Sequence, residues 1–175
     1  IFLINLKRRF DWRDRMLSTL AVLGIDITLT EAVDGKALNT SQLQAMGIDM
    51  LPGYKDPYSG CVLTQWEIGC FLSHYNIWKQ VLKQGLQHVL ALEDDVRFMQ
   101  WFRSRLVTIM ENVDQVGLDW DLIRSAGNLV HPDYSYWILG YTLSLQGGNR
   151  LLGALPLGKM LSEDKYLPVM FNKHP

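Results

Sequence analysis

The sequence HVLALEDDVRF, residues 88–98, joins a short apolar run directly to three consecutive carboxylates. The apolar part has the length and composition of a buried strand. If the chain stays extended, Glu93 and Asp95 point to one side of that strand and Asp94 to the other. Two carboxylates on one side at the carboxyl end of a strand suit a hard divalent cation. The alternative is a solvated turn in which Asp95 caps a helix that begins near Phe98, and this stretch leaves both interpretations open.

The composition is that of one folded domain. The 175 residues allow a sizeable core, and 48% of them are hydrophobic, which argues against disorder. A formal net charge of -1 provides no basic field for nucleic acid, and no run approaches the roughly 20 apolar residues of a membrane helix. The chain opens on Ile1 without an initiator methionine or signal peptide, so we expect one domain, residues 1–175, from a longer protein. Cys61 and Cys70 lack a CxxC spacing, and whether they form a disulfide stays open.

Segments with the pattern of strands alternate with segments with the pattern of helices. The expected strands are residues 1–6, 27–32, 88–92, 120–123 and 136–145. The expected helices are residues 11–24, 40–46, 64–85, 98–116 and 147–154, with a last one from residue 162 or 163. This alternation predicts an α/β fold with a mostly parallel central sheet flanked by helices. Such sheets bind ligands at the carboxyl ends of their strands, where this chain carries Asn5, Arg8, Asp34, Gly35 and the acids 93–95.

Signatures of several other enzyme classes are missing. The chain has no GxGxxG and no GxxxxGK[ST], which argues against dinucleotide oxidoreductases and P-loop NTPases. It has no GxSxG elbow, which argues against an α/β-hydrolase. The aromatic residues Trp66, Tyr75 and Trp78 are expected in the core rather than around a cofactor.

One expected helix offers a further candidate metal site. Glu67, Cys70 and His74 share a face of the helix over residues 64–85, and Cys70 and His74 have the i, i+4 spacing that can bind zinc. No third nitrogen or sulfur ligand stands at a signature distance. A core cysteine beside a buried, hydrogen-bonded histidine is therefore the favoured interpretation.

The remaining acidic residues suit phosphate chemistry on a metal. Glu93 and Asp95 are followed late in the chain by Glu163, Asp164 and His174. Carboxylates suit Mg²⁺ or Mn²⁺, and an added imidazole favours Mn²⁺. A metal that bridges two phosphates stabilises a departing nucleoside diphosphate, while a second carboxylate removes a proton from an incoming hydroxyl. This is the chemistry of a metal-dependent glycosyltransferase.

Six runs of the sequence, taken in order, resemble glycosyltransferase family 25. They are IFLINLKRRFDWRDRM (1–16), EAVDG (31–35), GCFLSHYNIW (69–78), LEDDVRF (92–98), DYSYW (133–137) and LPVMFNKHP (167–175). The run MLPGYKDPYSG (50–60) is similar to the animal branch of the family, the procollagen galactosyltransferases and their cell-adhesion relative. Bacterial lipooligosaccharide galactosyltransferases are more distant.

The resemblance implies a GT-A-like nucleotide-diphosphosugar transferase fold and a UDP-galactose donor. It implies Mn²⁺, with Mg²⁺ as the other option, and transfer with inversion to the hydroxyl of hydroxylysine in a collagen-like acceptor. It also implies that this chain is the second of two glycosyltransferase domains in one protein of the endoplasmic reticulum lumen.

The resemblance also assigns roles to particular residues. Glu93, Asp94 and Asp95 match the metal motif, with Asp95 as the direct ligand and Glu93 or Asp94 on the ribose or on a water. The other donor-binding positions are Asn5, Arg8, Arg9, Arg13, Asp34, Gly35, Ser73 and His74. Asp164 is the candidate catalytic base, and His174 completes a metal set with Asp95 and Glu93.

The sequence departs from the family pattern in several places. From the resemblance, Trp66, where a glycine is usual, and Cys61 are expected to be local surface changes, which stands against the core position expected for Trp66 as an aromatic residue. After Ile123 relatives continue into a Tyr-x-Gly-Arg segment and a variable loop, whereas Arg124 follows here, so we expect a loop to be missing between residues 123 and 124. Ser162-Glu163 and Lys165 stand where relatives have Pro-Val and an acid. Two alternatives therefore stay open: a non-catalytic binding or adhesion module of the same fold, and a bacterial-type lipooligosaccharide galactosyltransferase.

Overall fold

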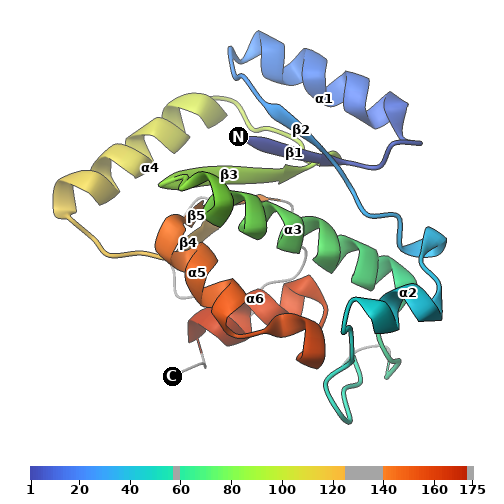
Figure 1. Ribbon diagram of the computed structural model, residues 1–175. Helices are drawn as coiled ribbons and strands as arrows, with labels where there is room; N and C mark the ends of the chain where they lie inside the picture. Colours follow the sequence, from blue (N-terminus) through green and yellow to red (C-terminus); the bar gives the residue numbers. More distant parts are fainter. Residues whose placement is uncertain (57–59, 125–139, 173–175) are drawn as a thin grey trace.

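Five strands form one sheet in the order β2–β1–β3–β5–β4 in the computed structural model, which describes residues 1–56, 60–124 and 140–172 (Figure 1). The strands are β1 (Phe2–Asn5), β2 (Thr28–Glu31), β3 (His88–Glu93), β4 (Leu122–Arg124) and β5 (Gly140–Ser144). β1 pairs in parallel with β2 and with β3, whereas β5 runs antiparallel to both β3 and β4. The predicted α/β fold with a mostly parallel central sheet is confirmed, and it is consistent with a GT-A-like fold.

Helices cover both faces of this sheet. α1 (Phe10–Val22) and α4 (Phe102–Val116) lie on one face, while α3 (Gln65–Gln84), α5 (Leu145–Gly153) and α6 (Glu163–Asn172) lie on the other (Figure 1). The short helix α2 (Thr40–Ala45) and the 3-10 turns η1 (Gly35–Ala37) and η2 (Pro156–Lys159) complete the described elements. The chain therefore forms three layers, with the sheet in the middle.

Period-2 alternation along the central strands explains the two hydrophobic clusters. In β1, Leu3 packs toward α1 and α4, whereas its neighbours Phe2 and Ile4 pack toward α3. In β3, Leu90 and Leu92 pack in the same cluster as Leu3. Val89 and Ala91 pack in the cluster on the other face of the sheet. Because both faces are buried, residues 2–4 of β1 and 89–92 of β3 are all apolar, as expected for the centre of a parallel sheet.

α3 is the helix that positions most of the site, and local sequence defines its ends. Thr64 and Glu67 form a capping box, in which each side chain bonds the backbone N–H of the other residue. Gly85 ends the helix with a left-handed φ of 63°, a conformation that costs glycine little. Between these ends Phe71 and Trp78 are fully buried, so the predicted limits and apolar stripe of this helix are confirmed.

The predictions for the segment after β3 are wrong. β3 ends at Glu93, and Asp94 and Asp95 lie in a turn, so the three carboxylates do not alternate along an extended strand. α4 begins at Phe102 rather than near Phe98, and Asp95 does not cap it. Phe98 packs in the cluster beneath α1 and α4, which holds this segment against the core before the helix starts.

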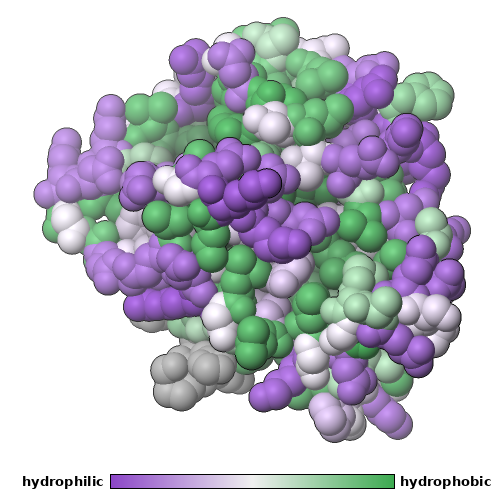
Figure 2. All heavy atoms as spheres, viewed as in Figure 1, coloured by the Kyte–Doolittle hydropathy of each residue, from purple (hydrophilic) through white to green (hydrophobic). Residues whose placement is uncertain are grey.

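The surface has no strong segregation of residue types on the side where α3 lies. Hydrophilic and hydrophobic residues are interspersed over this face (Figure 2). Among the described helices, none has both the length and the apolar character needed to cross a membrane. Cys61 and Cys70 are not joined in a disulfide.

Candidate active site

The carboxyl ends of β1, β2 and β3 meet at one edge of the sheet, because these three strands are parallel. A hollow of about 140 Å³ lies at this edge. Its lining comes from the end of β1, the segment after β2, α3 and the end of β3, and includes Leu6, Val33, Gly35, Trp66, His74, Glu93 and Asp94. This is the position at which open α/β sheets bind ligands, as the sequence predicted.

Asn5, at the end of β1, holds the acidic turn in place. Its side-chain N–H donates to Asp94 Oδ2 over 2.6 Å and to the Arg9 carbonyl oxygen over 3.0 Å. From α1, the Arg15 guanidinium donates to the Asp94 carbonyl oxygen over 2.7 Å. The turn that follows β3 is thus held by β1 and α1, which are distant from it in sequence. Arg15 was not predicted as a site residue.

A cationic and aromatic group borders the same hollow. Arg8 forms an ion pair with Asp34, and the Arg8 guanidinium carbon lies 5.4 Å from the centre of the Trp66 ring. The Lys36 ammonium lies 4.5 Å from the same ring. Trp66 is 49% exposed, so its predicted place in the core is wrong: it sits one residue into α3, where the helix meets the hollow.

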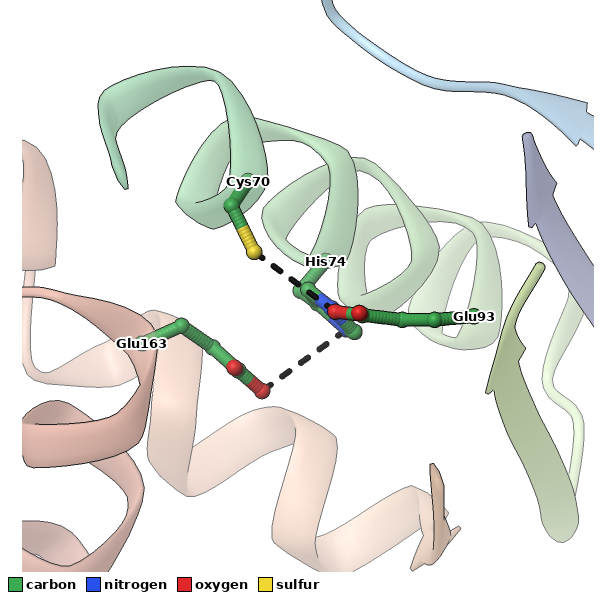
Figure 3. A group of neighbouring side chains, drawn as sticks. All are labelled: Cys70, His74, Glu93 and Glu163. Atoms are coloured by element: carbon green, nitrogen blue, oxygen red, sulfur yellow. Dashed lines mark hydrogen bonds and ion pairs between the residues drawn. The ribbon is translucent and has the colours of Figure 1, made fainter. Parts of the chain in front are cut away.

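One wall of the hollow is a polar network around His74. His74 is 1% exposed, and its Nε2 lies 3.0 Å from Glu93 Oε1 (Figure 3). Its Nδ1 lies 3.0 Å from the Tyr141 hydroxyl. That hydroxyl also accepts the indole N–H of Trp78 over 2.9 Å. The predicted buried, hydrogen-bonded histidine is present, but the cysteine beside it is exposed rather than in the core, with Cys70 Sγ 3.6 Å from Glu93 Oε1. Glu67, on the same helix, is instead used in the cap.

The pKa shifts at this edge point to an excess of negative charge. Burial, followed by the charges of Glu93 and Asp94, raises the pKa of Asp95. Burial also raises the pKa of the Cys70 thiol well above its usual value, with Glu93 and Glu163 adding to the effect. For His74 burial lowers the pKa, but the Glu163 charge and the bond to Glu93 outweigh it and the pKa is raised. A bound cation would relieve this field.

Asp95 has the features of a metal ligand. Its Oδ1 is buried and, within residues 1–56, 60–124 and 140–172, has no hydrogen-bond partner. A buried carboxylate oxygen of this kind is costly unless a cation or a donor faces it. Oxygen ligands are those that Mn²⁺ and Mg²⁺ prefer, so the residues present fit a hard divalent cation.

The remaining predicted site residues lie at different distances from the hollow. Ser73 holds the segment after β2, since its hydroxyl accepts the Val33 N–H over 2.9 Å. Arg9 pairs with Asp11, and Arg13 pairs with its neighbour Asp14, so neither side chain is paired with the acids 93–95. Asp164 lies in the first turn of α6, whereas His174 lies outside the described residues.

Glu163 is the site residue that the sequence analysis placed least well. It was treated as a departure from the family pattern, yet it is 4% exposed and its Oε1 lies 3.8 Å from His74 Nδ1. The sequence shows an acidic pair, Glu163-Asp164, near its end. Only the folded chain shows that the Glu163 side chain is directed inward, toward α3.

A larger open groove of about 660 Å³ runs between β2 and α3. It is bordered by Thr28, Lys79 and Lys83 and does not include the acids at the end of β3. The smaller hollow is the better candidate because it is the one that the strand ends, the acidic turn and His74 share.

Comparison with known proteins agrees with this geometry. The sequence model of glycosyltransferase family 25 (LPS biosynthesis protein) matches residues 1–132. Over its whole length the chain is 55% identical to procollagen galactosyltransferase 2 of Homo sapiens and 52% identical to procollagen galactosyltransferase 1 of Danio rerio, covering 30% and 32% of those proteins. It is also 48% identical to the probable inactive glycosyltransferase 25 family member 3 of Rattus norvegicus, covering 33% of it. The chain thus spans about a third of the length of these relatives, and it belongs to glycosyltransferase family 25.

Proposed function

We propose that this chain is a metal-dependent galactosyltransferase domain that moves galactose from UDP-galactose, with inversion, to the hydroxyl of collagen hydroxylysine. The observation that carries the proposal is the hollow at the carboxyl ends of β1, β2 and β3, which Glu93 and Asp94 line. Asp95 follows Asp94 in the same turn, and its Oδ1 is buried without a hydrogen-bond partner among the described residues. The names of the relatives support the choice of galactose and procollagen.

Each group at the hollow has a role in this proposal. Asp95 would hold Mn²⁺, with Glu93 or Asp94 on the ribose or on a water. When bound, the metal supplies Lewis-acid stabilisation of the diphosphate. Arg8 supplies positive charge beside the hollow, and Gly35 lets the segment after β2 come close to α3 and, in the proposal, to the uridine.

Asp164 is the proposed base that takes the proton from the acceptor hydroxyl. It lies in the first turn of α6, next to Glu163, whose Oε1 is 3.8 Å from His74. We place the reaction in the endoplasmic reticulum lumen because of the similarity to procollagen galactosyltransferases. We place a first glycosyltransferase domain in the same protein because the chain spans about a third of the length of these relatives.

The first test is isothermal titration of the chain with UDP, with and without Mn²⁺. We expect binding that needs Mn²⁺ and that Asp95→Ala abolishes, because the substitution removes the proposed ligand. Asp26→Ala is the matched control, since Asp26 is an exposed aspartate before β2, at the opposite edge of the sheet. Binding that persists without Mn²⁺, or in Asp95→Ala, contradicts the metal assignment.

The second test concerns the proton transfer. With a hydroxylysine peptide as acceptor, Asp164→Asn is expected to lower turnover by about 10²–10⁴-fold, the usual contribution of a general base, with UDP affinity unchanged. Turnover equal to that of the unmodified chain would exclude Asp164 as the base. Galactose transfer to lactose-like sugars but not to the peptide would indicate the bacterial type of acceptor.

A non-catalytic module of the same fold is the second candidate. The similarity to a relative named as probably inactive favours it, as does Lys165, which stands where active relatives are expected to carry an acid. If the unmodified chain binds UDP in neither condition, this candidate leads.

A further inference from the structure

Four side chains from three elements converge beside the candidate active site. Cys70 and His74 come from α3, Glu93 from the end of β3 and Glu163 from the start of α6, and Figure 3 shows all four directed toward one another. Each offers one ligand atom, and these four atoms lie within 4.8 Å of one another. We propose that this group, the Cys70–His74–Glu93–Glu163 cluster, is a second metal site and that it binds Zn²⁺.

The distances are close to those that a tetrahedral ion requires. Glu93 Oε1 lies 3.0 Å from His74 Nε2 and 3.6 Å from Cys70 Sγ. Zinc bonds of about 2.0–2.3 Å place neighbouring ligand atoms roughly 3.3–3.8 Å apart. The spacing of Glu93 and Cys70 lies in this range, and that of Glu93 and His74 is about 0.3 Å shorter than its lower end. Glu163 needs the largest adjustment, because its Oε1 lies 3.8 Å from Nδ1, on the other side of the imidazole ring.

The ligand types select zinc over a hard cation. Thiolate and imidazole groups are common ligands of Zn²⁺, whereas Mg²⁺ prefers oxygen ligands. Carboxylates are also found among the ligands of zinc sites. The hard-cation site proposed at Asp95 has oxygen ligands. The two sites thus differ in ligand chemistry but adjoin, because Cys70, His74 and Glu93 also line the hollow. Glu93 contacts both His74 and Cys70, so in this inference it binds Zn²⁺ and Asp94 takes the role on the ribose or on a water. The zinc site stands whether or not the chain binds UDP.

The surroundings of the cluster favour a fixed imidazole and a compensating cation. His74 Nδ1 faces the Tyr141 hydroxyl at 3.0 Å, which directs Nε2 toward Glu93 and Cys70. Such an outer hydrogen bond orients metal-bound histidines. His74 and Glu163 have side chains only 1% and 3% exposed, whereas the Glu93 side chain is 25% exposed and Cys70 is exposed. The imidazole and one carboxylate are therefore buried together, and the cluster is open to solvent on the side of the cysteine, where an ion can enter. Four protein ligands describe a closed, structural zinc site that would tie α6 to α3 and to the sheet.

The test is a cobalt titration of the chelator-treated chain. Co²⁺ in place of Zn²⁺ reports its ligands, because a bound thiolate adds an intense charge-transfer band in the near ultraviolet. We expect this band in the unmodified chain, its loss on addition of Zn²⁺ and its absence in Cys70→Ala. Cys61→Ala is the matched control, and since the chain has 2 cysteines, a band in that variant can come only from Cys70.

Two further variants make the assignment specific. Glu163→Gln keeps the shape of the side chain but removes its charge, and we expect it to weaken Zn²⁺ at least about tenfold, the lower end of the cost of losing even an outer partner. Asp95→Ala is expected to leave the cobalt band unchanged while it removes Mn²⁺-dependent UDP binding.

The proposal is overturned if the unmodified chain shows no thiolate band, if Cys61→Ala loses it, or if Glu163→Gln binds Zn²⁺ as tightly as the unmodified chain. Should Cys70→Ala fail to fold, the Cys61→Ala and Glu163→Gln results decide.

Discussion

Asp95, the proposed metal ligand, illustrates how a single partly buried carboxylate lowers the stability of its own fold. Burial and the neighbouring acids raise its pKa in the folded chain, so the folded state holds the proton more tightly than the unfolded state does. A group whose pKa is raised by folding stabilises the folded chain at pH values below its pKa in the unfolded chain. That stabilisation is lost as the pH rises through its pKa in the folded chain. At neutral pH the charged, metal-free carboxylate is therefore a cost.

We expect Asp95→Asn to raise the free energy of unfolding of the metal-free chain at neutral pH. The gain should be about 0.5 kcal/mol, the low end for single stabilising changes, because much of the side chain is solvated. Urea unfolding at several pH values measures it. The difference should shrink below the ordinary aspartate pKa, where Asp95 is itself protonated.

Asp26→Asn serves as the control for that measurement, and it should leave stability nearly unchanged at each pH. An Asp95→Asn variant that is less stable at neutral pH would show that the carboxylate is held by a favourable contact.

At the scale of elements, α3 and the segment after β2 come into unusually close contact. A Cβ added to Gly69 would lie 2.6 Å from the Gly35 backbone nitrogen and 2.7 Å from the Val33 carbonyl oxygen. A Cβ added to Gly35 would collide with the Gln65 carbonyl. Two glycines thus let the helix meet the segment that lines the hollow.

We expect Gly69→Ala to destabilise the chain by about 1–3 kcal/mol, the usual cost of overpacking, and to weaken Mn²⁺-dependent UDP binding, since the segment must move. Urea unfolding and titration calorimetry measure the two effects. Gly153→Ala is the control, because a Cβ there meets no atom within 4 Å and alanine favours the helix. Equal stability of the two variants would contradict the close contact.

Local signals explain why the elements were largely predictable. Thr64, Glu67 and Gly85 mark the ends of α3 within a few residues of chain, and the alternation along β1 and β3 follows directly from burial on both faces. The end of β3 was predicted to within one residue, but the start of α4 was not: Phe98 packs against the cluster beneath α1 and α4, and the helix begins only at Phe102. The inward position of Glu163 and the exposure of Trp66 likewise depend on how distant elements pack.

At the scale of the whole molecule, the central strands lie between two helical layers and the outer strands do not. β3 pairs on both sides, with β1 and with β5, and residues 89–92 are buried. β2 stands at one edge, and most of its residues are exposed.

Amide hydrogen exchange should reflect this arrangement. We expect the amides of β1 and β3 to exchange through global unfolding, with an opening free energy of about 5–15 kcal/mol, and those of β2 to open locally at lower cost. Mass spectrometry of exchanged peptides measures the difference. Protection in β2 equal to that in β3 would contradict the layered arrangement.

The pairing of β1 with β3 also has a consequence for the order in which the chain can fold. Asn5 bonds Asp94 across a separation of 89 residues. β1 therefore cannot pair with β3 until the residues between them have been synthesised. Contacts between such distant residues slow folding. The pairing of β1 with β3, which brings the acids to the end of β1, is therefore expected late in folding. Until β3 pairs with it, the apolar β1 is shielded from water only by α1 and β2.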